Sequence, residues 1–475
     1  KKPGIAVRDF EFLREGDFMS AGYASHAEAV KSINLANRFD RLPMTWFQNK
    51  LYLIIATAWL FDSIDLGGIT FLLPTLREHF HLSTVQAGLV GTMGFVGMFF
   101  GAAIAGMLAD RFGRKVVFQV SMLIWGTSAI MLAFSQGVNW IYFWRFVLGF
   151  GMGAEYPIAL AIVSEFIPTR VRGRYVTILE GFWPLGFILA GVMVALLLPY
   201  IGWRGIFLLE GLPAFWVFII RKQVPESPRW YESVKRYEEA DQTMKYIEKN
   251  VEARCGDKLP EPKPASLVVE EYKKTSFAEL WSKQYAIRTF VIWSLWGFCM
   301  YGYYALTTWL SALLVEQGYT IASSVNYTLL ISLAGIPGFI VAAWLVEKIG
   351  RKPSLIIYIG MSAVSCLMYG RAPSLTMVIA WGLCMQFFMF GMWCLMYAYT
   401  PELYPTRLRA TGAGFASSIG RVGAFLGPYV VGAIVGGVGI SGVFAMGAVS
   451  FVVAAVILLI FGPETRGKVL EELSH

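Results

Sequence analysis

Residues 110–115 read Asp-Arg-Phe-Gly-Arg-Lys, and residues 347–352 read Glu-Lys-Ile-Gly-Arg-Lys, 237 residues further along the chain. A second pair has the same offset, with Glu-Phe-Ile-Pro-Thr-Arg at 165–170 and Glu-Leu-Tyr-Pro-Thr-Arg at 402–407. A third motif, Pro-Glu-Ser, begins at Pro225 and recurs as Pro-Glu-Thr after 238 residues. Separate motifs repeated at one offset indicate that the chain consists of two duplicated halves with the same topology.

Long apolar segments surround these motifs, and each is long enough to cross about 30 Å of hydrocarbon as a helix. We therefore expect an all-α polytopic membrane protein with twelve transmembrane helices in two parallel six-helix halves. A pseudo-two-fold axis along the membrane normal would relate the halves, with a binding site between them near the midplane. The expected spans lie near 51–74, 85–108, 116–136, 140–164, 175–199, 206–222, 288–314, 325–346, 353–370, 374–400, 409–434 and 441–462.

The composition agrees with a membrane-embedded chain. Of the 475 residues, 56% are hydrophobic and 15% are charged, whereas a soluble chain carries about 25% charged residues. These values exclude a soluble enzyme, and the long spans exclude a β-barrel, whose strands alternate in short segments. The basic residues lie in loops between spans, so nucleic acid is not an expected partner. The five cysteines have no metal-ligand spacing, and we expect no metal site.

The loops predict the domains and their orientation. Nearly all Lys and Arg residues lie in the termini, the central loop and every second short loop, so both termini are expected in the cytoplasm. The predicted domains are a cytoplasmic N-terminal segment (1–50), a first six-helix bundle (51–222), a cytoplasmic helical linker (223–287), a second six-helix bundle (288–462) and a cytoplasmic tail (463–475).

The motifs resemble those of the major facilitator superfamily over essentially the whole of 51–475. The loop after the second span, Gly106-xxx-Asp-Arg-x-Gly-Arg-Lys115, is similar to the signature of that superfamily. Arg145-xxx-Gly-x-Gly-x-Gly153 in the fourth span and Pro225-Glu-Ser-Pro-Arg229 after the sixth are similar to motifs of its sugar-porter and organic-ion branches. The resemblance implies a secondary transporter, a monomer in the plasma or inner membrane, and no cofactor.

Three further segments resemble particular branches. Arg38-Phe-Asp-Arg-Leu-Pro43 and Ser417-Ser-Ile-Gly-Arg421 look like segments of the niacin, organic-ion and synaptic-vesicle-glycoprotein-like branch. Organic-anion members carry an arginine at the place that Arg421 matches, so the resemblance implies a small anionic substrate, such as nicotinate. Asp62-Ser-Ile-Asp65 resembles a motif of aromatic-acid/proton symporters, which again implies an aromatic carboxylate.

Ionisable side chains within the spans are costly and indicate function. Asp62 and Asp65 lie three residues apart, so their carboxylates share a helix face at about 5 to 6 Å and hinder each other's ionisation, which allows one of them to bind and release a proton. Asp65 resembles the span-one aspartate of proton-coupled sugar porters, and Arg145 resembles its span-four partner. We expect a switch in which protonation breaks this pair, with Glu155 as a further proton-coupling candidate. The alternative is a permanent ion pair that fixes helix packing.

Arg421 is the main candidate for substrate binding, because a guanidinium matches a carboxylate with two parallel hydrogen bonds. The alternative is a structural partnership of Arg421 with Glu155 or Asp62. Aromatic rings on the central helices can stack on a flat substrate or attract a cation. The aromatic candidates are Trp59, Tyr156, Trp183, Trp296, Tyr303, Tyr304, Trp393 and Tyr397. Glu180 is expected to be structural or part of an inner gate.

Charges at the cytoplasmic helix ends predict a gate whose ion pairs join the halves in the outward-open state and break on inward opening. The alternative is that these charges serve only solubility and topology. The predicted gate residues are Asp110, Arg114, Glu165, Arg172, Glu226, Arg229, Glu347, Arg351, Glu402, Arg409 and Glu464.

The sequence as a whole predicts a transporter that carries a small organic anion, nicotinate or a related aromatic carboxylate, by proton symport and alternating access. One alternative is a carrier of an organic cation or a neutral, sugar-like solute with the same fold. The other is a receptor that binds its ligand without transporting it. The absence of a GxxxxGK[ST] phosphate loop argues against an ATP-driven pump.

Overall fold

The computed structural model describes residues 35, 37–256, 258–262, 277–404 and 406–465, without the side chains of Thr169, Thr177, Thr406, Arg407, Arg409 and Ala410. Most of the expected N-terminal segment, part of the linker and most of the tail therefore lie outside the described residues, as does the side chain of the predicted gate residue Arg409. The described part of the chain is helical and contains no strand.

Two groups of helices follow each other along the chain. The first group is α2 (Trp46–His79), α3 (Thr84–Phe112), α4 (Arg114–Ala133), α5 (Val138–Phe166), α6 (Thr169–Gly211), the short η1 (Leu212–Phe215) and α7 (Trp216–Gln223). The linker contributes α8 (Pro228–Ser233), α9 (Tyr237–Cys255) and η2 (Phe277–Trp281). The second group is α10 (Ala286–Glu316), α11 (Ile321–Leu333), α12 (Gly335–Ile349), α13 (Arg351–Gly370), α14 (Leu375–Glu402) and α15 (Thr406–Phe461).

The described part of the chain makes twelve crossings, as predicted. The described residues contain 10 helical segments long and apolar enough to span a membrane, and two of these are long enough to cross twice. Each of the two turns back at a glycine, Gly202 with φ of 65° and Gly439 with φ of 66°. A positive φ is readily adopted only by glycine. The two glycines are 237 residues apart, so the turn obeys the same duplication as the sequence motifs.

The first turns of several helices are stabilised by side chains. At the start of α2, Thr45 and Gln48 form a capping box, and Ser83 and Gln86 form another at the start of α3. Such boxes satisfy backbone N–H groups that the helix itself leaves free. The starts of α4 and α13 follow glycines with φ near 100° and are capped from a distance, as described below.

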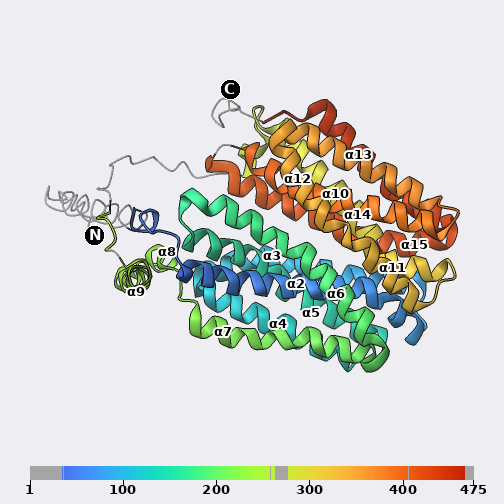
Figure 1. Ribbon diagram of the computed structural model, residues 1–475, viewed down its shortest axis with the longest axis horizontal. Coiled ribbons are helices and arrows are strands. Elements are labelled where there is room, and N and C mark those ends of the chain that lie inside the picture. The colour runs from blue at the N-terminus through green and yellow to red at the C-terminus, as the bar shows by residue number, and fades with distance from the viewer. Residues whose placement is uncertain (1–34, 36, 257, 263–276, 405, 466–475) are drawn as a thin grey trace, which may run out of the picture.

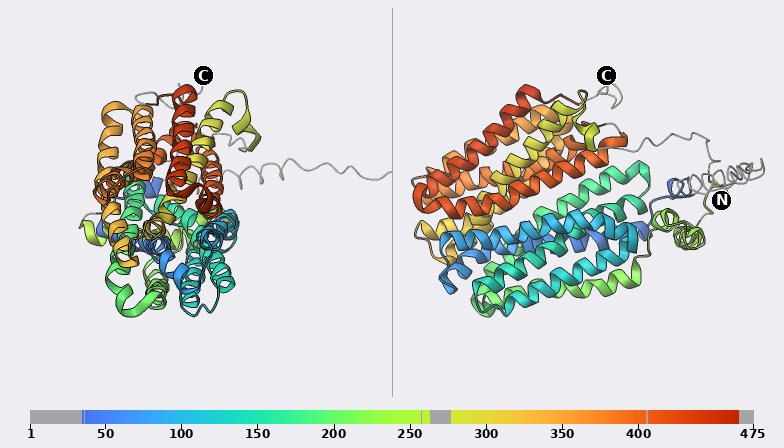
Figure 2. Two further views of the ribbon diagram at one scale, coloured as in Figure 1. Left: turned by 90° about the vertical axis from the view of Figure 1, so that its right-hand side faces the viewer. Right: turned by 180° about the vertical axis from the view of Figure 1, so that it is seen from behind.

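The two helix groups form two bundles that lie side by side (Figure 1). We call the end of the molecule where α8 and α9 lie the linker face, and the opposite end the distal face. The bundles meet near the distal face and diverge toward the linker face, as Figure 1 and the right-hand view of Figure 2 show. In the distal half, the Thr92 hydroxyl of α3 donates a hydrogen bond to the Phe425 carbonyl of α15 at 2.9 Å. Arg77 of α2 forms an ion pair with Glu316 of α10 across the same boundary.

Glycines bring α3 and α5 into direct backbone contact. A Cβ atom added at Gly149 would lie 1.9 Å from the Gly94 carbonyl oxygen, and one added at Gly101 would lie 2.0 Å from the Phe150 carbonyl oxygen. Only residues without a side chain permit this approach. The close contact fixes the position of Arg145, which extends from α5 against α3.

The linker helix α9 is attached to the segment before α2 by ion pairs. Arg38 donates two hydrogen bonds to Glu248, at 2.9 and 2.7 Å, and a third to Asp241 at 2.6 Å. Arg41 pairs with the same Glu248 at 2.5 Å. Burial alone would raise the pKa of Glu248, but the two guanidinium groups outweigh burial and lower this pKa below the usual glutamate value.

Candidate functional site

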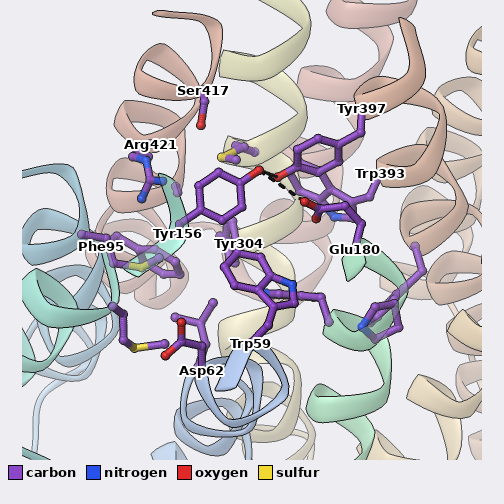
Figure 3. A pocket seen from close by; sticks show the side chains of 18 of the residues that line it. Trp59, Asp62, Phe95, Tyr156, Glu180, Tyr304, Trp393, Tyr397, Ser417 and Arg421 are labelled. Atoms are coloured by element: carbon purple, nitrogen blue, oxygen red, sulfur yellow. Dashed lines mark hydrogen bonds between the residues drawn. The ribbon is translucent and has the colours of Figure 1, made fainter. Parts of the chain in front are cut away.

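A cavity lies between the two bundles and contains about 920 Å³ of space not filled by atoms, part of it open to solvent. Both bundles contribute to its wall, as expected for a site between duplicated halves. Its lining residues are Trp59, Asp62, Leu66, Phe95, Met98, Met152, Tyr156, Glu180, Trp183, Pro184, Met300, Tyr304, Phe339, Phe390, Trp393, Tyr397, Ser417, Arg421 and Ala424. We call this space the central cavity (Figure 3).

Arg421 is the cationic side chain of the central cavity. Its guanidinium lies over the Tyr156 ring, with Cζ 5.7 Å from the ring centroid. Among the described residues it forms no ion pair, so the expected alternative of a structural partnership with Glu155 or Asp62 is not seen. A partly buried guanidinium without an acidic partner is costly at bilayer depth, and an anion that enters the cavity is the group able to neutralise it.

A pair of tyrosines connects the two bundles at the boundary of this cavity. The Tyr156 hydroxyl of α5 donates a hydrogen bond to the Tyr397 hydroxyl of α14 at 3.1 Å, and it lies 3.5 Å from the carboxylate of Glu180. A second cavity begins beyond them and extends toward the linker face between α5, α14 and α15. Tyr156, Tyr397, Ser417 and Arg421 line both cavities and thus separate them.

The predicted aromatic residues divide into three groups. Six of them line the central cavity, and the indole N–H groups of Trp59 and Trp393 are buried there without a hydrogen-bond partner. Trp296 lines the second cavity instead and donates a hydrogen bond to Thr400 at 2.9 Å. Tyr303 lines neither cavity, because it is fully buried with its ring against that of Trp393. The six in the central cavity are Trp59, Tyr156, Trp183, Tyr304, Trp393 and Tyr397.

The two acids of the first span point to different neighbours. Asp62 lines the central cavity, whereas Asp65 lies behind it, 3.5 Å from Arg145, with both side chains 1% exposed. One oxygen of Asp65 and two nitrogens of Arg145 have no hydrogen-bond partner. The residues predicted to exchange a proton are therefore paired, incompletely, one helical turn from the cavity wall.

Two further acids lie outside the cavity wall. Glu155, a proton-coupling candidate, is fully buried and accepts a hydrogen bond from the Trp125 indole at 2.7 Å, with one oxygen unpartnered. Glu210 is buried beside Asp65, and a Cβ atom added at Gly68 would lie 1.9 Å from its carboxylate. The part of α6 that follows the turn at Gly202 thus brings a second acid to the Asp65–Arg145 pair.

The predicted gate residues contact partners within their own half. Glu226 accepts hydrogen bonds from the backbone N–H groups of Arg114 and Lys115, at 3.0 and 3.2 Å, and so caps α4. Glu464 caps α13 in the same way, through Arg351 at 3.1 Å and Lys352 at 3.1 Å. Burial is the main cause that raises the pKa of Glu226.

The remaining gate residues follow the same pattern. Arg114 pairs with Asp110 at 2.6 Å and with Glu165 at 3.6 Å, while Arg351 pairs with Glu402 at 2.9 Å. Arg229 lies over the Phe39 ring, Arg172 is half-buried, and Glu347 is exposed. The gate prediction places ion pairs between the halves in an outward-open state. This structure is in a different state, because its bundles meet at the distal face and diverge at the linker face.

Several lining residues were not predicted. They include Phe95 and Met98 of α3, Met152 of α5, and Phe339 and Phe390 of the second bundle. Apolar residues that face a cavity and apolar residues that face lipid have the same composition, so the sequence carried no signal for them. For Glu180 the sequence did carry a signal, because an acid within a span is costly. Its position along the chain, however, does not show that it faces the cavity.

A twelve-helix protein in two like halves, with a cavity between them and one open face, is the architecture of a secondary transporter. The sequence matches the family described as "Sugar (and other) transporter" over residues 24–475. The chain therefore belongs to this family of major facilitator superfamily transporters.

Individual relatives agree with this assignment. The chain is 39% identical to the niacin transporter NiaP of Acinetobacter baylyi, over 93% of this chain and 100% of that protein. It is 33% identical to the putative niacin/nicotinamide transporter NiaP of Bacillus subtilis, over 89% of this chain and 98% of that protein. Its fold is similar to an inward-open structure of the xylose transporter XylE of E. coli, with a TM-score of 0.70 and 18% identity over 90% of this chain and 99% of that one.

Proposed function

We propose that this protein carries a small organic anion, nicotinate or a related aromatic carboxylate, by proton symport and alternating access. One observation carries the choice of an anion: Arg421 lines the central cavity and forms no ion pair among the residues described. A carboxylate that enters the cavity gains two charge-assisted hydrogen bonds from this fork. The niacin transporter from A. baylyi, 39% identical to this chain, supports the same class of substrate.

The aromatic wall fits a flat ring. Trp59 lies against Tyr156 with ring centroids 4.7 Å apart, and Tyr304 lies near Trp393 with ring centroids 6.4 Å apart. A pyridine or benzene ring between such faces gains dispersion and quadrupole interactions. The unpartnered indole N–H groups of Trp59 and Trp393 are further donors for an anion.

For proton coupling we propose the pair Asp65–Arg145, close to Asp62 at the cavity wall. Their separation of 3.5 Å and their unpartnered atoms describe a weak pair, which protonation of Asp65 can release. Release would allow α2 and α5 to shift relative to each other and so couple the proton to the conformational change. The linker face is proposed to be cytoplasmic, because it carries the basic loops.

A binding experiment tests the role of Arg421. Titration of purified protein with nicotinate and with its uncharged amide, nicotinamide, compares two ligands with the same ring. Replacement Arg421→Ala should lower the affinity for nicotinate by about 10- to 100-fold, the value of a lost charged hydrogen-bond pair. The affinity for the amide should stay unchanged. Arg421→Lys should give an intermediate affinity, and Arg371→Ala, which removes an exposed arginine at the distal face, should have no effect.

Two results would overturn the proposal. If nicotinate and nicotinamide bind the unmodified protein equally, Arg421 does not select an anion. If organic cations bind instead, the acids Asp62 and Glu180 of the cavity wall would be the binding groups, and the cation-carrier alternative would hold. Counterflow in reconstituted vesicles separates a carrier from a receptor, since a receptor exchanges no substrate.

A further inference from the structure

Glu180 of α6 is the acidic side chain of the central cavity that the proposed function leaves without a role. It is 9% exposed and lines the cavity on the side of the first bundle. Its hydrogen-bond partner is the Tyr156 hydroxyl at 3.5 Å, a long contact, and no lysine or arginine among the described residues forms an ion pair with it.

Tyr156 lies between Glu180 and Arg421. Arg421 lies over the ring face, and Glu180 lies beyond the hydroxyl that the ring carries (Figure 3). A tyrosine side chain consists of a six-membered ring with one polar substituent, which is also the shape of an aromatic carboxylate. A ligand ring lying along Tyr156 with its carboxylate on Arg421 therefore presents its far edge to Glu180.

The chemistry of that far edge distinguishes one aromatic acid from another. An unpaired carboxylate at this depth is costly. Glu180 has no cationic partner in the described part of the chain, so it is the neutral, protonated acid that fits this site, and its O–H group can donate a hydrogen bond. The nitrogen of a pyridine carboxylate accepts such a bond in the plane of its ring. Benzoate, which has a C–H group at the same place, cannot accept it.

We propose that Glu180 recognises the ring nitrogen of a bound pyridine carboxylate and thereby makes the cavity select pyridine over benzene carboxylates. This inference rests on the proposed function, in which Arg421 holds the carboxylate. Glu180 acts as a specificity-determining residue, and Tyr156 acts as the positioning residue between it and Arg421. The Tyr156 hydroxyl donates to Tyr397 and can accept from Glu180 only over 3.5 Å, so a ligand nitrogen at ordinary hydrogen-bond distance competes with a long contact for the Glu180 proton.

The test is a set of affinities on purified full-length protein for nicotinate, benzoate and picolinate. The unmodified protein should bind nicotinate about tenfold more tightly than benzoate, the value of one hydrogen bond to a buried group. Picolinate, with its nitrogen next to the carboxylate and away from Glu180, should bind like benzoate. Glu180→Leu should reduce the nicotinate-to-benzoate ratio to about one, whereas Glu180→Gln, whose amide still donates, should keep most of it.

Each contrary result has a separate meaning. Equal binding of nicotinate and benzoate by the unmodified protein would overturn this inference but leave the proposed anion carrier intact, and this arm needs no variant to fold. An unchanged ratio in Glu180→Leu would also overturn it. A ratio lost instead in Asp62→Leu, which removes the donor, would assign the nitrogen to the other cavity acid. If neither acid binds the unmodified protein, the proposed function itself fails.

Discussion

Arg145 and Arg421 both lie at bilayer depth, and their surroundings give them different tasks. Arg145 is fully buried with Asp65 at 3.5 Å and with α3 closely packed against it. Arg421 faces a cavity and an aromatic ring. A buried pair stabilises one arrangement of helices until one partner is neutralised, whereas an unpaired cation attracts a ligand. Under the proposed function, the same residue type therefore serves conformational coupling at one place and recognition at the other.

Replacement Asp65→Asn tests the coupling role. The amide cannot exchange a proton, so accumulation of nicotinate driven by a pH gradient should fall at least tenfold in reconstituted vesicles, while counterflow without a gradient should persist. Loss of the acid also leaves Arg145 unpaired, which costs about 3 to 5 kcal/mol for a buried pair, so the variant should unfold at a lower temperature. Undiminished pH-driven accumulation would assign the proton to another acid.

Two glycines of α3 provide a matched pair for packing. Gly101→Ala places a Cβ atom 2.0 Å from the Phe150 carbonyl oxygen, so α3 and α5 must separate, whereas a Cβ atom at Gly106 meets nothing within 4 Å. We expect Gly101→Ala to destabilise the protein by about 1 to 3 kcal/mol and Gly106→Ala to be neutral or slightly stabilising. Thermal unfolding in detergent measures both, and equal melting temperatures would contradict the close contact.

At the scale of elements, the charged residues of the signature motifs hold helix ends in place. Glu226 and Glu464 cap α4 and α13 within their own bundles, and each accepts backbone N–H groups next to a glycine with φ near 100°. An acid at a helix start also interacts favourably with the helix dipole. These contacts stabilise the starts of α4 and α13 within their own bundles.

The attachment of α9 should depend on pH and on Glu248. Because two guanidinium groups lower the pKa of Glu248, its ion pairs contribute stability above the ordinary pKa of 4.5, and this stability is lost as the pH falls through the lowered value. The protection of the α9 amides against hydrogen exchange, corrected for the intrinsic exchange rate at each pH, should therefore fall on acidification below about pH 4.5, and at neutral pH in Glu248→Gln. Glu238→Gln, at an exposed position of the same helix, should exchange as the unmodified protein does. Equal exchange in both variants would contradict the attachment.

At the scale of the molecule, the distal closure is held by packing and by the Arg77–Glu316 ion pair between α2 and α10. A partly exposed pair contributes up to about 1 kcal/mol, so Arg77→Ala should shift the population toward distal opening by up to about fivefold. Spin labels at Glu78 and Gln317, one on each bundle, measure the opening as longer distances. Arg204→Ala is the control, because Arg204 bonds the Ser135 carbonyl within its own bundle. An unchanged distance distribution in Arg77→Ala would assign the closure to packing alone.

The overall architecture was readable from the sequence because its signals are local. A run of about 20 apolar residues is long enough to cross the membrane wherever it lies in the fold, and motifs repeated at an offset of 237 residues reveal the duplication without any knowledge of contacts. The turns at Gly202 and Gly439 obey the same offset. Arg421 was also identified from the sequence as a cavity candidate, because an arginine within a span is costly unless it faces a cavity or a partner.

The direction in which each side chain points was decided only by the tertiary structure. Asp62 faces the cavity while Asp65 faces Arg145, and Tyr304 lines the cavity while its neighbour Tyr303 is buried. Successive residues point about 100° apart around a helix. A small rotation of the helix about its axis therefore changes which residue faces the cavity, which faces a partner side chain and which faces lipid. That rotation is set by the packing of twelve helices against each other, which the spacing of residues along one helix does not contain.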